Sequence, residues 1–79
     1  MAPTPSSEPL DRLATIAHDL NNLLTQIMMN CDLLLEALPP GHIAREDALT
    51  SRAAAMRGAE LTYQLHSLVR ELKARGERL

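Results

Sequence analysis

The sequence has little of what most small folds use to build a core. Tyr63 is the single aromatic residue among 79, and Phe and Trp are absent. Strands favour aromatic and β-branched residues, so a core built from Leu, Ile, Met and Ala indicates helices packed on helices. A chain of this length makes one small domain with a thin core, for which oligomerisation is a common remedy.

Cysteine and charge are also scarce. Cys31 is the only cysteine, which excludes an internal disulfide and is typical of a reducing compartment. The formal net charge of -2 gives no electrostatic attraction to nucleic acid or to an anionic membrane surface. No apolar run approaches a membrane span, and the N-terminus lacks the features of a signal peptide. We therefore expect a cytoplasmic protein without nucleic-acid or membrane contact.

Prolines and glycines indicate where the helices begin and end. Residues 1–9 contain Pro3, Pro5 and Pro9, which predicts a flexible leader. The apolar pattern that follows predicts a first helix over about residues 10–38. Proline disfavours a helical conformation in the residue before it and glycine permits a turn, so Pro39-Pro40-Gly41 ends this helix in a turn over 39–42.

A second helical pattern follows the turn. It predicts a helix over about 43–75, with Gly76 as the C-cap and residues 76–79 as a tail, so that residues 10–75 form one helical hairpin. Because the connection is short, the two helices must run antiparallel.

The turn also sets a register between the helices. Leu38 is expected opposite Ile43, and counting back from this pair places Leu23 level with Gly58. The same count places His18 level with Tyr63.

Apolar residues repeat every seven positions in both helices. In the first helix we assign the core seam to Leu13, Leu20, Ile27 and Leu34, beside a second track of Ile16/Ala17, Leu23/Leu24, Cys31 and Leu38. The second helix has the tracks Ala48, Ala55, Thr62, Val69 and Leu49, Met56, Tyr63. These stripes are wider than one helix–helix contact needs, and monomers seldom expose large apolar patches. We therefore expect an all-α antiparallel two-helix hairpin that forms a homodimeric four-helix bundle.

A polar cluster lies within the apolar pattern of the first helix, in the stretch AHDLNNLLT. With Leu13 at heptad position a, the side chains of His18, Asn22 and Thr25 fall on the side away from the seam. A neutral imidazole on a rigid helix is a good nucleophile that can be offered to a large partner. The Asn22 amide shares the histidine's face and can bond a phosphoryl oxygen or position a water. The Asp19 carboxylate can orient the ring or accept its proton.

AHDLNNLLT resembles the H-box of the dimerisation and histidine-phosphotransfer (DHp, HisKA-type) domain of two-component sensor histidine kinases. It is most similar to the subgroup that reads AHDFNNLLT. RGAELTYQL, at residues 57–65, resembles the RGAxLTxQLL segment of that subgroup, and the resemblance covers roughly residues 10–72. Leu20 stands where the subgroup has Phe, and Leu23 stands where many histidine kinases have a kinking proline, so we expect a straighter first helix.

The resemblance implies a histidine phosphotransfer function. His18 would be the phosphoacceptor, phosphorylated on a ring nitrogen by ATP that is bound with magnesium in a separate catalytic domain. Asp19 would assist this transfer, and Asn22 would support dephosphorylation of a partner response regulator. The receiver domain of that regulator would dock below His18 against both helices, and its aspartate would take the phosphoryl group.

No glycine-rich nucleotide-binding region follows the second helix. We therefore expect no cofactor bound by this chain, and enzyme activity in its own right stays an open question. The chain is either part of a longer kinase or a small protein that receives phosphate from elsewhere. Two alternatives remain: an interaction module that binds a histidine kinase or response regulator without carrying phosphate, and a structural dimerisation module.

Plainer interpretations apply to the remaining notable residues. Thr25 is expected to be solvent-exposed, His42 to be inert in the turn, and His66 to lie at a core edge. The three histidines are too scattered for a metal site, whose ligands must converge. Cys31 is expected to be a small core residue. Gly58 is costly inside a helix, so it is expected to permit close approach of a helix or of a docked partner.

Overall fold

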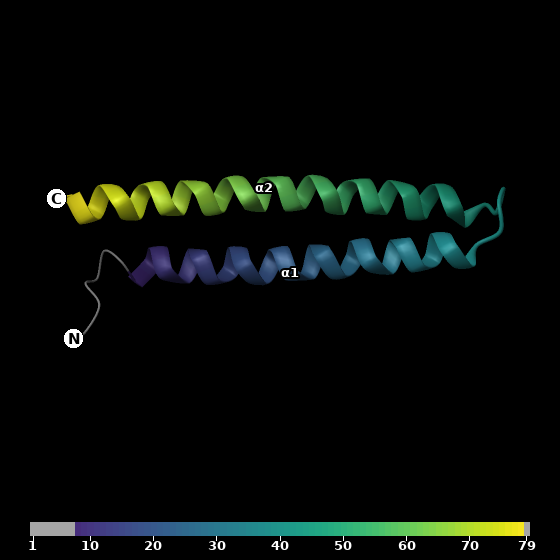
Figure 1. Cartoon of the computed structure of the whole chain (residues 1–79), viewed down its shortest axis with the longest axis horizontal. Helices are drawn as coiled ribbons and strands as arrows, with labels where there is room; N and C mark the ends of the chain where they lie inside the picture. The colour runs from purple at the N-terminus through teal and green to yellow at the C-terminus, as the bar shows by residue number, and fades with distance from the viewer. Residues whose placement is uncertain (1–7, 79) are drawn as a thin grey trace.

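Two long helices lie side by side in the computed structural model of this chain, which describes residues 8–78 (Figure 1). Helix α1 spans Glu8–Ala37 and helix α2 spans Ala44–Arg78. They run antiparallel along a molecule 58 Å long. The expected all-α hairpin is confirmed. No helix within the described range combines the length and apolar character that crossing a bilayer requires.

The helix ends differ from the expected bounds. Helix α1 begins at Glu8, so Pro9 lies in its first turn, where the missing N–H of proline costs no hydrogen bond. Helix α2 continues through Gly76 to Arg78. Among the described residues only Gly41 has a positive φ, so the prediction of Gly76 as a C-cap is wrong. Residues 1–7 of the expected leader and residue 79 of the expected tail lie outside the described residues.

The turn is held by local hydrogen bonds. Gly41 has a φ of 82°, a left-handed conformation that glycine adopts without Cβ strain. The backbone N–H of His42 donates to Pro39 O over 3.0 Å, and the N–H of Ala44 donates to Nδ1 of His42 over 3.0 Å. His42 therefore has a capping role at the start of α2, although the sequence indicated none.

Arg45 joins the first turn of α2 to the last turn of α1. Its Nη1 donates to the backbone oxygens of Leu35, over 2.8 Å, and Leu38, over 3.2 Å, in a half-buried setting. The carbonyls at the end of a helix have no partner within that helix. A guanidinium from the other helix therefore satisfies two of them and fixes the angle at which the chain leaves α1.

Replacing Arg45 by methionine is expected to lower the free energy of unfolding by about 1–2 kcal/mol, because two half-buried carbonyls lose their donor. Urea denaturation followed by circular dichroism measures this loss. Arg57→Met is the matched control, since Arg57 is exposed on the same helix. Its effect is expected to stay within about 0.5 kcal/mol. Equal losses in the two variants would contradict the role given to Arg45.

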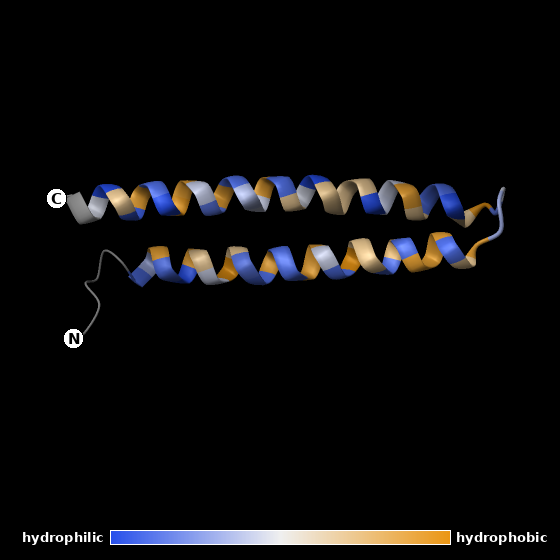
Figure 2. Ribbon diagram, in the orientation of Figure 1, coloured by the Kyte–Doolittle hydropathy of each residue, from blue (hydrophilic) through white to orange (hydrophobic). Residues whose placement is uncertain are grey.

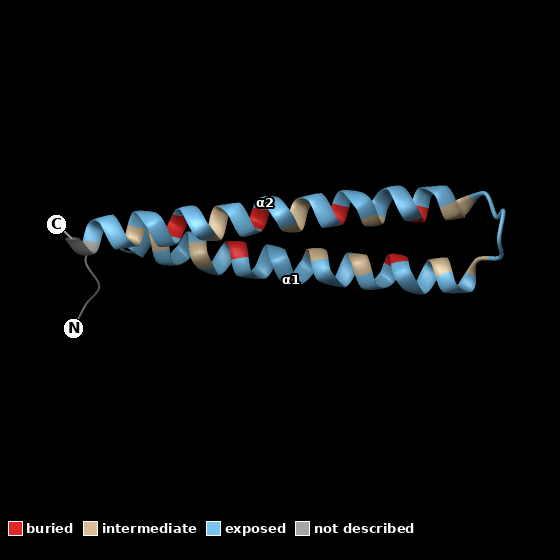
Figure 3. Cartoon of the chain, turned by 45° about the horizontal axis from the view of Figure 1, so that its top comes forward, coloured by how far each residue is buried: buried red, intermediate tan, exposed pale blue. Residues whose placement is uncertain are grey.

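Small side chains form the contact between the helices. The buried residues lie where α1 and α2 face each other (Figure 3) and are Ala17, Cys31, Ala48, Ala55, Thr62 and Val69. The Thr62 hydroxyl donates to Gly58 O over 2.8 Å, so this buried polar group has a partner. The expected seven-residue track from Ala48 to Val69 is confirmed as the α2 seam, and Cys31 is confirmed as a core residue.

The α1 seam is not the track that the sequence indicated. Leu13, Leu20, Ile27 and Leu34 are exposed by 39%, 43%, 45% and 52%. Helix α2 packs instead against the neighbouring stripe, whose buried and half-buried members are Leu10, Ala14, Ala17, Leu24, Met28, Cys31, Leu35 and Leu38. The seam of Leu13 and its repeats is therefore not the one that faces α2 within the hairpin, and its place in the core of a four-helix bundle stays a prediction. Only the neighbouring stripe carries the small residues that let two helices approach closely.

Gly58 receives the side chain of Leu24. A Cβ atom built on Gly58 would lie 3.0 Å from Cδ2 and 3.1 Å from Cδ1 of Leu24. The expected close approach of a helix at Gly58 is confirmed, with its partner one position beyond the expected Leu23.

Replacing Gly58 by alanine is expected to destabilise the hairpin by about 1 kcal/mol. Alanine gains about 1 kcal/mol of helix propensity, and overpacking against Leu24 costs about 1–3 kcal/mol. Gly76→Ala is the matched control, because a Cβ there meets nothing within 4 Å. That variant is expected to be as stable as the parent or up to about 1 kcal/mol more stable. Thermal melts of both variants measure the difference, and an equal gain from both would contradict the packing described.

Candidate functional site

His18 and Asn22 lie one turn apart on the surface of α1. Both residues are exposed, and Nδ2 of Asn22 lies 3.4 Å from Nδ1 of His18. Residues four positions apart on a helix are neighbours on one face, as the sequence predicted for this pair. The exposed imidazole is therefore held by a neighbouring amide on a regular helix.

This contact distinguishes the two ring nitrogens of His18. The direction of this contact depends on the ring tautomer: Nδ2 of Asn22 donates to an unprotonated Nδ1, and with the amide turned over its oxygen accepts from Nδ1–H. Among the described residues Nε2 has no hydrogen-bond partner. It is therefore the ring nitrogen that Asn22 leaves free.

Asp19 and Thr25 do not contact the imidazole by a hydrogen bond. The side chain of Asp19 points about 100° around the helix from that of His18, and it is exposed. The hydroxyl of Thr25 donates to Asn21 O over 2.9 Å, within its own helix, and the residue is exposed as expected. Asn22 is therefore the one of these three that directly positions the ring.

Two ion pairs fix the register of the helices on the side where His18 lies. Asp11 pairs with Lys73, and Oδ1 of Asp32 lies 2.6 Å from Nε of Arg52. The two pairs have the same antiparallel offset, although they lie three heptads apart. We call this row of cross-helix positions the flank ladder.

His18 and Thr25 occupy the α1 positions between these two ion pairs, at seven-residue spacing. The corresponding α2 positions, at the same spacing from Arg52, are Ala59 and His66. The constant offset therefore places His18 on one rung with His66, and Thr25 on the next with Ala59. His66 is half-buried, as its predicted place at a core edge requires.

The sequence placed His18 level with Tyr63 and on the side of α1 away from the seam. Its side chain is exposed. The contact of Leu24 with Gly58 puts His18 level with Gln64, next to the expected Tyr63, whereas the offset of the two ion pairs puts it level with His66. The seven-residue spacing of Asp11, Asp32 and His18, matched by that of Lys73, Arg52 and His66, is the sequence signal that reveals this rung.

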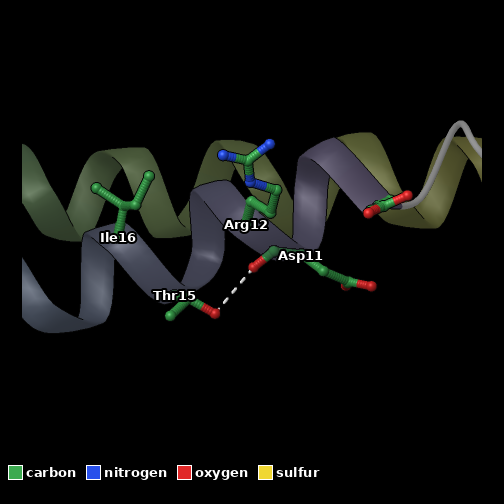
Figure 4. Close-up of a pocket in the computed structure, with 5 residues that line it drawn as sticks. Asp11, Arg12, Thr15 and Ile16 are labelled. Atoms are coloured by element: carbon green, nitrogen blue, oxygen red, sulfur yellow. Dashed lines mark hydrogen bonds between the residues drawn. The ribbon is translucent and has the colours of Figure 1, made fainter.

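The hollows on this surface are shallow. One lies along α1 near its start and is lined by Glu8, Asp11, Arg12, Thr15 and Ile16 (Figure 4). Another lies near the turn and includes Cys31, Leu38 and Ala48. His18 lines neither of these two, and its side chain is exposed on α1. Within the described range no group of three or more His, Cys, Asp or Glu side chains is placed to hold a metal ion.

Comparison with known proteins adds no assignment: no family model, curated protein or solved structure matches this chain. The functional argument therefore rests on the residues and geometry of the chain.

Proposed function

We propose that this chain is a histidine phosphotransfer and dimerisation module of two-component signalling, with His18 as the phosphoacceptor. The observation that carries the proposal is the exposed His18 imidazole, whose Nδ1 lies 3.4 Å from the amide of Asn22 on a regular helix. The likeness of AHDLNNLLT and RGAELTYQL to the phosphotransfer domains of sensor histidine kinases supports the same function. A cytoplasmic location accords with it.

The proposed reaction uses the ring nitrogens in different ways. Nε2 attacks the phosphorus of the donor, a P–N bond forms, and the bond from phosphorus to the leaving oxygen breaks. For this step the lone pair must be on Nε2 and the proton on Nδ1. Turning the Asn22 amide over presents its oxygen to Nδ1–H and holds that tautomer. The proton stays on Nδ1 while the P–N bond forms, and it passes to the Asp19 carboxylate, exposed on the adjacent face, when the Asn22 amide and the ring separate.

The phosphoryl donor belongs to a second domain or protein in this proposal. We assign ATP and magnesium to a separate histidine-kinase catalytic domain, because the described residues of this chain do not form a set of metal ligands. The acceptor of the second transfer is the aspartate of a response-regulator receiver domain. There the P–N bond breaks and the phosphoryl group passes to a carboxylate oxygen, while Asn22 positions water when the regulator is dephosphorylated.

An apolar surface beside the flank ladder supports receiver docking below His18, toward the turn. Leu49 and Met56 are exposed by 52% and 44% on the α2 face next to Arg52. On α1, Thr25 lies on the same side. A receiver seated on both helices here would bring its aspartate to His18 from the open side of the ring.

A second apolar surface supports the proposed homodimer. Its α1 part is the exposed stripe Leu13, Ile16, Leu20, Leu23, Ile27 and Leu34, and its α2 part is Leu61, Leu65, Leu68 and Leu72. Apolar residues lie on more than the facing sides of the two helices (Figure 2). The members of each stripe lie either three positions after or one position before a residue of their own seam. These offsets point the same way around both helices, so both stripes fall on one side of an antiparallel hairpin. Two hairpins packed through this side would bury both stripes in a four-helix bundle.

Phosphate transfer in vitro tests the function. The protein is incubated with a complete histidine kinase and ATP, or with phosphorylated receiver domains, and acid-labile, base-stable label is measured. Label on the wild-type chain, passed on to a receiver, is the expected result. A dimer that binds kinase or receiver but takes no label from any of several donors would favour the non-catalytic interaction module.

A further inference from the structure

We propose that Met56 is an oxidation site, where a peroxide converts the thioether into mainly one sulfoxide epimer because Arg52 covers one side of the sulfur. The observation that carries this inference is a direct contact: Nη1 of Arg52 donates to Sδ of Met56 over 3.2 Å. The histidine chemistry of α1 makes no use of this sulfur. The oxidation itself is independent of the proposed function, and only its effect on docking rests on that function.

The Met56 side chain is exposed, and the cation beside its sulfur is held in place. Met56 is 44% exposed on α2, so a small peroxide in solution can reach it. Nε of Arg52 lies 2.6 Å from Oδ1 of Asp32 on α1. Because Nε and Nη1 belong to one planar guanidinium, the ion pair with Asp32 also orients the N–H that meets the sulfur.

The contact with Arg52 makes the two lone pairs of the Met56 sulfur unequal. Addition of oxygen to one lone pair or the other gives the two epimers of methionine sulfoxide. Donation from Nη1 occupies one lone pair, and the other is left for the oxidant. One epimer should therefore predominate at Met56.

The oxidant belongs to the class of hydrogen peroxide and organic hydroperoxides. A sulfur lone pair forms a bond to one peroxide oxygen, and the O–O bond breaks. The transferred oxygen gives up its hydrogen to the departing oxygen, which leaves hydrogen peroxide as water. Sulfur is oxidised by two electrons and the peroxide is reduced by two. Methionine sulfoxide reductases reverse the change, with a separate enzyme for each epimer.

Met29 provides a comparison within the same chain. It is 60% exposed on α1, and no hydrogen bond reaches its sulfur from the described residues. Exposure by itself therefore predicts oxidation at Met29 as well as at Met56, but it predicts no preference between epimers. Only Met56 has a donor fixed against its sulfur, so the epimer ratio separates the effect of Arg52 from that of exposure.

Oxidation would change the apolar surface formed by Leu49 and Met56. Leu49 is 52% exposed beside Met56, and the two form the surface to which receiver docking is assigned above. A sulfoxide turns a flexible apolar side chain into a polar one, whose oxygen must lose water in an apolar contact. Under the proposed function, oxidation of Met56 therefore weakens receiver binding while leaving the His18 imidazole unchanged.

Peroxide treatment of the folded protein tests the inference without any partner. The parent, Arg52→Gln and the matched control Arg57→Gln are treated with dilute hydrogen peroxide and digested with trypsin. In each protein Met56 is the only methionine of its tryptic peptide, which spans residues 53–57, 46–57 or 53–70 respectively. Each epimer is measured as the fraction of sulfoxide that an epimer-specific reductase removes from that peptide. Circular dichroism establishes that each variant is folded.

The parent is expected to give one epimer at Met56 in about fivefold excess, the ratio that corresponds to one ordinary hydrogen bond. Arg57→Gln should keep this excess. Arg52→Gln should bring the two epimers within about twofold of each other, as should Met29 in the parent, because neither sulfur then has a fixed donor. Equal epimers at Met56 in the folded parent, or an undiminished excess in Arg52→Gln, would overturn the inference.

The docking effect has its own measurement. Parent protein oxidised at Met56 is expected to bind a receiver domain about tenfold more weakly than reduced protein, and the reductase for the predominant epimer should restore binding. Equal binding by the two forms would overturn this effect. Failure of the proposed function has a different signature: the epimer excess at Met56 remains, but no receiver domain binds either form.

Discussion

The His18→Gln protein is expected to take up no acid-labile, base-stable label from a complete histidine kinase, a loss of at least a hundredfold. Glutamine keeps the size and polarity of an exposed helical residue but has no ring nitrogen that can form a P–N bond. His18 is exposed, so the substitution is expected to leave the stability of the hairpin unchanged within about 0.5 kcal/mol.

Substitutions of Asp19 and Asn22 are expected to have smaller effects on phosphate labelling in the same assay. Asp19→Asn should slow labelling by about a hundredfold, since general acid–base assistance is typically worth about 10²–10⁴. Asn22→Ala should leave the acceptor able to take label but weaken dephosphorylation of the receiver. His42→Gln is the matched control for loss of a histidine, because His42 lies in the turn and contacts Ala44. Label that persists on His18→Gln would exclude the site assignment.

Replacing Leu20 by glutamate is expected to convert a homodimer into monomers, raising the dissociation constant by at least about a hundredfold, or roughly 3 kcal/mol. Leu20 lies in the middle of the exposed α1 stripe and is 43% exposed in the single hairpin. In a four-helix bundle its side chain would be buried, and a carboxylate in its place would lack a partner. Sedimentation at several micromolar concentrations measures the change.

Leu33→Glu is the matched control for this substitution. Leu33 is 61% exposed and shares its seven-residue track with the polar residues Asp19 and Gln26, on the side of α1 opposite α2. It is expected to remain dimeric. The melting temperature of the wild type should rise with protein concentration, whereas that of Leu20→Glu should not. A stable wild-type monomer at micromolar concentration, or a Leu20→Glu protein that stays dimeric, would contradict the dimer.

The contrast between small and large apolar residues organises this hairpin. Ala17, Cys31 and Ala55 are buried where the helices meet, while Leu20 and Ile27 stay largely exposed. A contact made by alanine and cysteine brings two helices close but buries little area per residue. The larger side chains stay exposed in the single hairpin, and the proposed homodimer would cover them.

The sequence by itself determined the two helices, the turn at Pro39-Pro40-Gly41 and their antiparallel course, because proline, glycine and apolar periodicity act locally along the chain. It also placed His18 and Asn22 together on one exposed face, since a spacing of four residues fixes neighbours on any helix. These features need no knowledge of what packs against α1.

The tertiary structure decided which α1 stripe faces α2. Two adjacent apolar stripes satisfy the heptad pattern equally well, and periodicity cannot choose between them. The choice depends on shape, because α2 packs against the stripe with Ala17 and Cys31 and places Gly58 against Leu24. The same choice leaves Leu20 and Ile27 largely exposed beside the seam.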